Sequence, residues 1–129
     1  MNAIEYIKEH HCKDSIITKD IVLAKFCALE NNYKHSFVIP CNLLNIVYSG
    51  TKILHTVDSD IEVQAGEAFF ITKGEYVMSE VVGETEYKCL LIFFDHHLMR
   101  KLISELPFKL NTNRNIDTKN IFKFPVDAF

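Results

Sequence analysis

The chain has 129 residues, of which 48% are hydrophobic and 24% are charged, and its formal net charge is −3 at pH 7. This length fits one domain that can bury a core without disulfides or metal, and the apolar content excludes a disordered chain. The negative net charge argues against nucleic-acid binding by this chain alone, because binding to a phosphate backbone requires a positively charged surface.

The first 17 residues carry charges where a signal peptide needs an apolar core, and no apolar run reaches membrane-spanning length. We expect residues 1–17 to form a partly ordered N-terminal segment. The four cysteines show no CxxC spacing, so we expect reduced thiols rather than disulfides. Together these features predict a cytoplasmic protein with no membrane partner.

Residues 18–94 consist of short runs of strand-forming residues separated by turn signals. The expected strands are 21–29, 37–39, 43–48, 52–57, 61–63, 68–71, 76–82 and 87–94. Seven or eight short strands with frequent turns are typical of a sandwich or a small barrel. The sequence therefore predicts a mainly β fold with its barrel in residues 18–94.

A change of hydrophobic period follows this barrel region. Asp95 can cap a helix over residues 95–107, which ends at Pro107 and would flank the barrel. Its apolar surface exceeds what packing on the barrel needs, so a weak homodimer is expected, with a monomer as the alternative. The dimer-interface candidates are Leu98, Met99, Leu102 and Leu106. Residues 108–129 contain a polar loop and an apolar ending, and are expected to lead into a further part of a longer parent protein.

The segment 66–81, GEAFFITKGEYVMSEV, resembles the second sequence signature of the cupin superfamily. That signature contains a glycine, a turn that ends in a second glycine, a metal-binding histidine and an asparagine. Here Gly66 and Gly74 retain the turns, while Val77 stands at the histidine position and Val81 at the asparagine position.

The first cupin signature lacks its metal donors as well. If Gly50 is its terminal glycine, the glutamate position falls on Leu43, and the histidine positions fall on residues 37 and 39 or on 36 and 38. These residues are apolar or carry a hydroxyl group, whereas transition metals in such sites need imidazole or carboxylate donors. No nucleophile, base and orienting group can be assembled from the sequence either. We therefore expect no metal, no cofactor and no catalytic residue, and a metal-dependent cupin enzyme is the disfavoured alternative.

Residues 35–106 resemble the N-terminal regulatory domain of AraC-type transcription activators. The resemblance lies in Tyr48-Ser49-Gly50, the hairpin 52–63, the turns at 65–67 and 70–74, and the helix after Asp95. Within it, residues 66–79 are most similar to the branch that contains type III secretion activators. The resemblance implies a cupin-like double-stranded β-helix with a C-terminal helix. It also implies DNA binding by a second half of the parent, which nothing in this chain matches.

A barrel without metal can hold one small effector, or side chains can fill it. Matching Val77 to a metal-facing histidine puts Val77, Ser79 and Val81 inside, and Tyr76 and Met78 outside. The ligand-pocket candidates are Tyr48, His55, Val77, Ser79 and Tyr87. The expected partner is a small-molecule effector or a regulatory protein. A packed barrel that docks a protein such as an anti-activator stays open beside the sensor.

Overall fold

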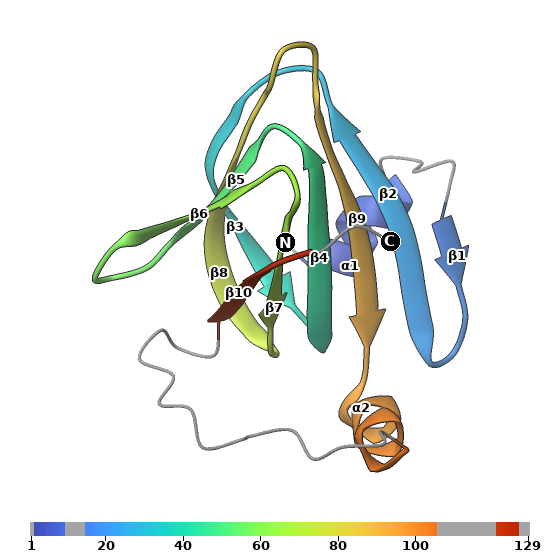
Figure 1. The fold of residues 1–129 in the computed structure, drawn as a ribbon. Coiled ribbons are helices and arrows are strands. Elements are labelled where there is room, and N and C mark those ends of the chain that lie inside the picture. The colour runs from blue at the N-terminus through green and yellow to red at the C-terminus, as the bar shows by residue number, and fades with distance from the viewer. Residues whose placement is uncertain (1, 10–14, 106–120, 127–129) are drawn as a thin grey trace.

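The computed structural model describes residues 2–9, 15–105 and 121–126. Ten strands within these ranges form two antiparallel sheets that face each other across a common core (Figure 1). The six-stranded sheet has the order β1 (Ser15–Ile17), β2 (Ile21–Ala28), β9 (Tyr87–Phe94), β4 (Asn42–Ser49), β7 (Glu67–Ile71) and β10 (Ile121–Pro125). The four-stranded sheet has the order β3 (Asn32–Ile39), β8 (Gly74–Val81), β5 (Thr51–His55) and β6 (Asp60–Gln64). The mainly β prediction is confirmed.

Each of the eight expected strands is present; 87–94 matches β9, and the other seven have shifted ends. The largest difference is β3, which begins at Asn32 and not at residue 37. The first residues of β3 are polar, so the hydrophobic pattern does not mark them as a strand. The pairing between β3 and β8 is also irregular between Asn32 and His35. Lys34 lies in this irregularity with a φ of 47°. The bulge therefore explains why residues 32–36 do not read as a regular strand.

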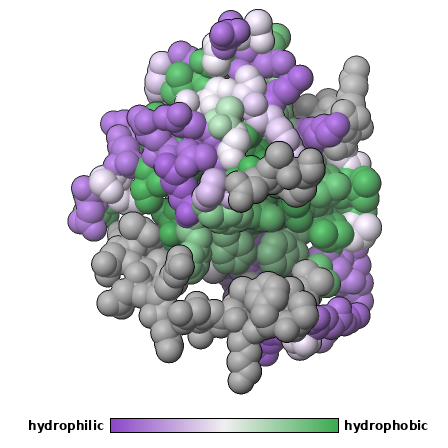
Figure 2. Space-filling view, viewed as in Figure 1, coloured by the Kyte–Doolittle hydropathy of each residue, from purple (hydrophilic) through white to green (hydrophobic). Residues whose placement is uncertain are grey.

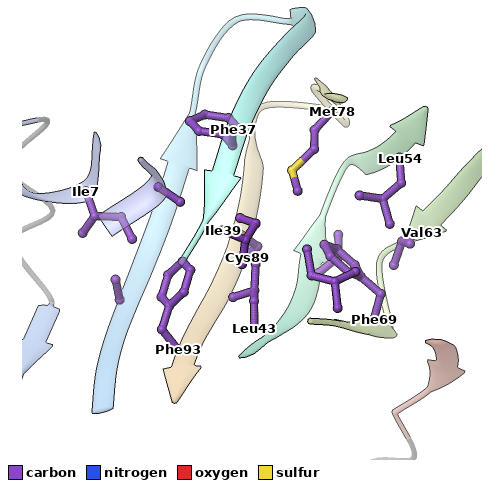
Figure 3. Packing of buried hydrophobic residues seen from close by; sticks show 14 of the residues in the cluster. Ile7, Phe37, Ile39, Leu43, Leu54, Val63, Phe69, Met78, Cys89 and Phe93 are labelled. Carbon is purple, nitrogen blue, oxygen red and sulfur yellow. The ribbon is translucent and has the colours of Figure 1, made fainter. Parts of the chain in front are cut away.

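The core lies between the two sheets, because alternate side chains of each strand point inward. Figure 3 shows Phe37 and Ile39 of β3, Leu43 of β4 and Phe93 of β9 among these inward side chains. All four are at most 8% exposed. Three of the apolar residues at the replaced metal-ligand positions are thus core residues.

The N-terminal helix α1 (Ala3–Glu9) covers the side of the barrel between β2 and β3. Asn2 caps it, because its Oδ1 accepts hydrogen bonds from the backbone N–H of Ile4 at 2.9 Å and of Glu5 at 3.3 Å. Ile7 is 2% exposed and points into the core. The Tyr6 ring contacts Phe26 of β2 and Phe37 of β3, with centroid distances of 6.0 and 5.2 Å. This helix therefore joins the two sheets.

The second helix, α2 (His96–Ser104), follows β9 as the sequence predicts. Asp95 Oδ1 accepts a hydrogen bond from the Leu98 backbone N–H at 2.8 Å, which confirms the predicted cap. The apolar ending forms β10, which pairs with β7. Neither helix in the described ranges has the length and apolar character needed to cross a membrane.

The glycine at the turn between β4 and β5 cannot be replaced without cost. Gly50 has a φ of +82°, and a Cβ there would lie 2.5 Å from the Val81 carbonyl oxygen. Gly66 has a similar φ of +90°, but a Cβ there would meet nothing within 4 Å. A side chain at Gly66 would thus suffer backbone strain alone, whereas one at Gly50 would suffer backbone strain and a steric clash.

We expect Gly66→Ala to lower the free energy of unfolding by about 1–2 kcal/mol, which is the cost of the left-handed backbone alone. Gly50→Ala should cost about 1–3 kcal/mol more, because the added methyl group displaces the Val81 carbonyl. Urea unfolding of both variants tests this difference. Equal losses for the two variants would contradict the described packing of the Gly50 turn.

Candidate functional site

A cavity of about 40 Å³ lies between the two sheets beneath α1. Side chains of α1, β2, β3, β4, β5, β8 and β9 line it, and most of them are apolar. The wall residues that carry polar groups are Tyr6, Asn45, Lys52, Glu80 and Cys89. A volume of this size holds a few water molecules, whereas pockets for drug-sized ligands measure about 300–1,000 Å³.

Glu80 and Lys52 form an ion pair on the inner face of the four-stranded sheet. The two residues are direct cross-strand neighbours of β8 and β5. Lys52 Nζ donates to Glu80 Oε2 at 3.0 Å, and the two side chains are 7% and 2% exposed. His35 of β3 adds a third group, since its Nε2 lies 2.9 and 3.0 Å from the two carboxylate oxygens. One buried carboxylate thus joins three neighbouring strands.

The charge state of Glu80 follows from this pairing. Burial raises the pKa of Glu80, but the charge of Lys52 and the hydrogen bond from His35 lower it by more. The pKa of Glu80 therefore lies below its ordinary value of 4.5. Glu80 is therefore ionised at neutral pH. Because its pKa is lower in the folded chain, the ionised carboxylate stabilises the fold above about pH 4.5. That stabilisation is lost as the pH falls through the folded value.

The opposite wall of the barrel carries polar groups of another kind. The side chain of Asn45 is 1% exposed, and neither its Oδ1 nor its Nδ2 has a hydrogen-bond partner in the part of the chain that the structure describes. The hydroxyl of Tyr87 is also buried without a well-formed hydrogen bond, and it lies beside the Asn45 amide and the Cys89 thiol. An unsatisfied buried polar group costs about 1–3 kcal/mol. Asn45 is therefore a costly residue for a sealed core.

Two further interior groups stay neutral at pH 7. Burial raises the pKa of Tyr87 well above its ordinary value of 10, and it raises the pKa of Cys89 to about 11. A reactive cysteine needs a lowered pKa and an accessible thiolate. Cys89 is 2% exposed and protonated, so it acts as a small core side chain.

The predicted inward and outward faces of β8 are exchanged. Met78 and Glu80 line the cavity, whereas Val77 and Ser79 do not. The expectation was wrong because it matched Val77 to an inward histidine, and a slip of one residue reverses both faces of a strand. The residue at the former histidine position therefore points away from the barrel interior.

None of the five predicted pocket residues lines the cavity. His55, Val77 and Ser79 lie close together, because His55 is the cross-strand partner of Val77 and its Nε2 lies 2.7 Å from Ser79 Oγ. Tyr48 is 56% exposed, and Tyr87 is buried within the core. The predicted pocket is thus divided among the surface, the outer face of the four-stranded sheet and the core.

Ser79, His55 and Asp60 have the connectivity of a hydrolase triad. His55 Nδ1 lies 2.8 Å from Asp60 Oδ1, in addition to its contact with Ser79. Ser79, however, is 1% exposed, and its Oγ also accepts a hydrogen bond from the Lys34 backbone N–H at 2.8 Å. The Ser79 hydroxyl thus provides a hydrogen-bond acceptor for a backbone N–H in the bulge of β3. Its burial leaves no room for a substrate at the oxygen.

The dimer-interface candidates are only partly described. Leu98 is a half-buried residue of α2. Met99 and Leu102 also belong to α2, and Leu106 lies outside the described residues. Among the described residues, no three histidine, cysteine, aspartate or glutamate side chains gather as metal ligands. The homodimer and the absence of metal remain proposals.

The outer side of the six-stranded sheet is also apolar. Phe70 packs against Phe94 and Phe122 there, with ring-centroid distances of 6.0 and 6.2 Å. Figure 2 shows a band of apolar surface across the middle of the view. We call the following half-buried residues the outer apolar face: Leu44, Ile46, Phe70, Leu90, Ile92, Phe94 and Phe122.

Residues 42–129 match the family model of the ExsA N-terminal regulatory domain. The chain belongs to this family. The match confirms the resemblance to regulatory domains of AraC-type activators and to the branch of type III secretion activators. No curated protein matches the chain in sequence.

Solved structures show the same fold at low sequence identity. Apo ToxT from Vibrio cholerae has a TM-score of 0.65 at 10% identity over 85% of this chain and 43% of that chain. ToxT with a bound unsaturated fatty acid has a TM-score of 0.63 at 9% identity, over 85% of this chain and 42% of that chain. A cupin superfamily protein from Desulfitobacterium hafniense has a TM-score of 0.50 at 11% identity, over 62% of this chain and 72% of that chain. The cupin-like fold is thus confirmed, and this chain spans less than half the length of ToxT.

Replacing Lys52 by methionine should leave the Glu80 carboxylate buried without its cation. We expect Lys52→Met to lower the free energy of unfolding by about 3–5 kcal/mol, and the double variant Lys52→Met/Glu80→Met to recover most of this loss. Urea unfolding at pH 7 measures both. A Lys52→Met variant as stable as the wild type would contradict a buried, ionised pair.

Proposed function

We propose that this chain is the effector-responsive regulatory domain of a bacterial AraC-type transcription activator, working in the cytoplasm. The family match over residues 42–129 carries this proposal. The net charge of −3 and the absence of a basic footprint support assigning DNA binding to another part of the parent. The domain then acts by changing the activity of that other part.

The cavity under α1 is the proposed effector site. Its wall includes one helix and strands of both sheets, so an occupant there contacts all three and can respond to how they are arranged. An effector that fits one arrangement better than another shifts the population of the two. ToxT, which shares the fold, has been solved with an unsaturated fatty acid bound, and this supports a role for the fold in holding amphiphilic molecules.

The domain is also proposed to hold no metal and to catalyse no reaction. The residues at the former ligand positions, such as Leu43 and Val77, supply no donors. The Ser79–His55–Asp60 set is the strongest catalytic candidate, and the 1% exposure of Ser79 argues against attack on a substrate. Its hydrogen bonds support a structural role for this set in holding the bulge of β3.

Docking of a regulatory protein is a second candidate function. The outer apolar face favours it, because a contiguous apolar surface on a soluble domain often marks a protein contact. This face and the cavity lie on opposite sides of the six-stranded sheet. A parent protein that responds to a regulatory protein and to no small molecule would favour docking over sensing.

The parent sequence beyond residue 129 should encode two helix-turn-helix units. In a mobility-shift assay, the parent should bind its promoter DNA, and the chain 1–129 should not. A parent without such units, or DNA binding by the chain 1–129 itself, would contradict the assignment to an AraC-type activator.

Purified chain 1–129 should contain iron, manganese and zinc far below one atom per chain, as measured by elemental analysis. A fluorophosphonate probe, which labels reactive serines, should react no better with the wild type than with Ser79→Ala. Stoichiometric metal that chelators remove with loss of stability would overturn the metal-free claim. Labelling confined to Ser79 would overturn the non-catalytic claim.

A further inference from the structure

Two asparagines of β4 offer an internal comparison within the barrel. Asn42 and Asn45 are each 1% exposed, and neither side-chain amide makes a well-formed hydrogen bond among the described residues, although the Asn45 amide lies beside the Tyr87 hydroxyl and the Cys89 thiol. Only Asn45 lines the cavity. Because the two residues are three positions apart on one strand, their side chains point to opposite faces of the sheet. Asn45 is therefore a polar group on the wall of a partly open, mostly apolar space.

The charged groups of the cavity wall are already paired with each other. Lys52 donates to Glu80, and Glu80 also contacts His35. A carboxylate ligand would have to compete with Glu80 for Lys52, and a cationic ligand would have to compete with Lys52 for Glu80. Two further wall residues carry titratable groups, Tyr6 and Cys89, and burial keeps the Cys89 thiol protonated. Neither an anionic nor a cationic ligand would therefore meet an unpaired opposite charge on this wall.

We infer that the cavity binds an uncharged, largely apolar molecule whose polar group both donates and accepts hydrogen bonds to the Asn45 amide. A carboxamide fits this requirement best, because it offers one carbonyl acceptor and an N–H donor to the matching pair on asparagine. The Lys52–Glu80 pair stays intact when the ligand binds. This inference rests on the proposed effector site and names its ligand class.

The size of the cavity determines how such a molecule enters. The space of about 40 Å³ accepts a small polar group, but not an alkyl chain as well. Tyr6 and Ile7 of α1 form part of its wall. An apolar tail needs more room than this, and an outward shift of the helix would provide it, with the tail replacing the contacts of the helix. Ligand binding and the position of α1 are coupled in this way.

Three probes of equal chain length test the ligand class: hexanamide, hexanoate and hexylamine. Isothermal titration calorimetry with the chain 1–129 at pH 7 should give an affinity for hexanamide at least tenfold higher than for either charged probe. Asn45→Leu should weaken hexanamide binding at least tenfold. The matched control Asn42→Leu, which removes the same group from the other face of β4, should change it less than twofold.

A measurement on the unaltered chain makes the result independent of how the variants fold. In heteronuclear NMR spectra, hexanamide should shift the side-chain amide resonances of Asn45 and leave those of Asn42 in place. Tighter binding of hexanoate would overturn the inferred ligand class while leaving an effector site in the cavity. If no probe binds, the cavity is a sealed part of the core and the inference is wrong. The DNA-binding and metal tests would still decide the proposed function.

Discussion

The interior of this barrel depends on the buried ion pair between Glu80 and Lys52. Taking either charge out of water alone is costly, so each requires the other. Their position as cross-strand neighbours of β8 and β5 provides that contact, and His35 extends it to β3. Three strands of the four-stranded sheet are thus held together by one carboxylate. An alternative register that moved Glu80 by one residue would leave Lys52 without its counterion.

The same pair determines what the interior can do. Its charges cancel within the protein, so the cavity presents neither a free anion for a metal nor a free cation for a carboxylate. The residues at the former cupin ligand positions are packed or face outward, and the buried amide of Asn45, beside Tyr87 and Cys89, is the proposed recognition group. Helix α1 closes the space above it by joining β2 and β3. This balanced interior, with no metal-ligand cluster among the described residues, supports the proposed metal-free regulatory role.

Local patterns were sufficient to predict the strands, but not the arrangement of their faces. Turn residues and short apolar runs located eight strands, and Asp95 marked the start of α2. The inner face of β8 was assigned wrongly because Val77 was matched to a metal ligand. Lys52 and Glu80 went unnoticed, since a charged residue in an alternating strand normally points to solvent. Their pairing depends on the contact between β5 and β8, which the sequence pattern does not specify.

The ionisation of Glu80 in the folded chain is the most direct test of this account. Carbon-13 NMR can follow the side-chain carboxylate of Glu80 as the pH is lowered while the chain stays folded. The account predicts a pKa below the ordinary value of 4.5, because Lys52 and His35 favour the charged form. A pKa above that value would show that burial outweighs the pairing. A pKa above 7 would in addition leave Lys52 without an ionised counterion at neutral pH, and the inferred uncharged ligand would then lose its basis.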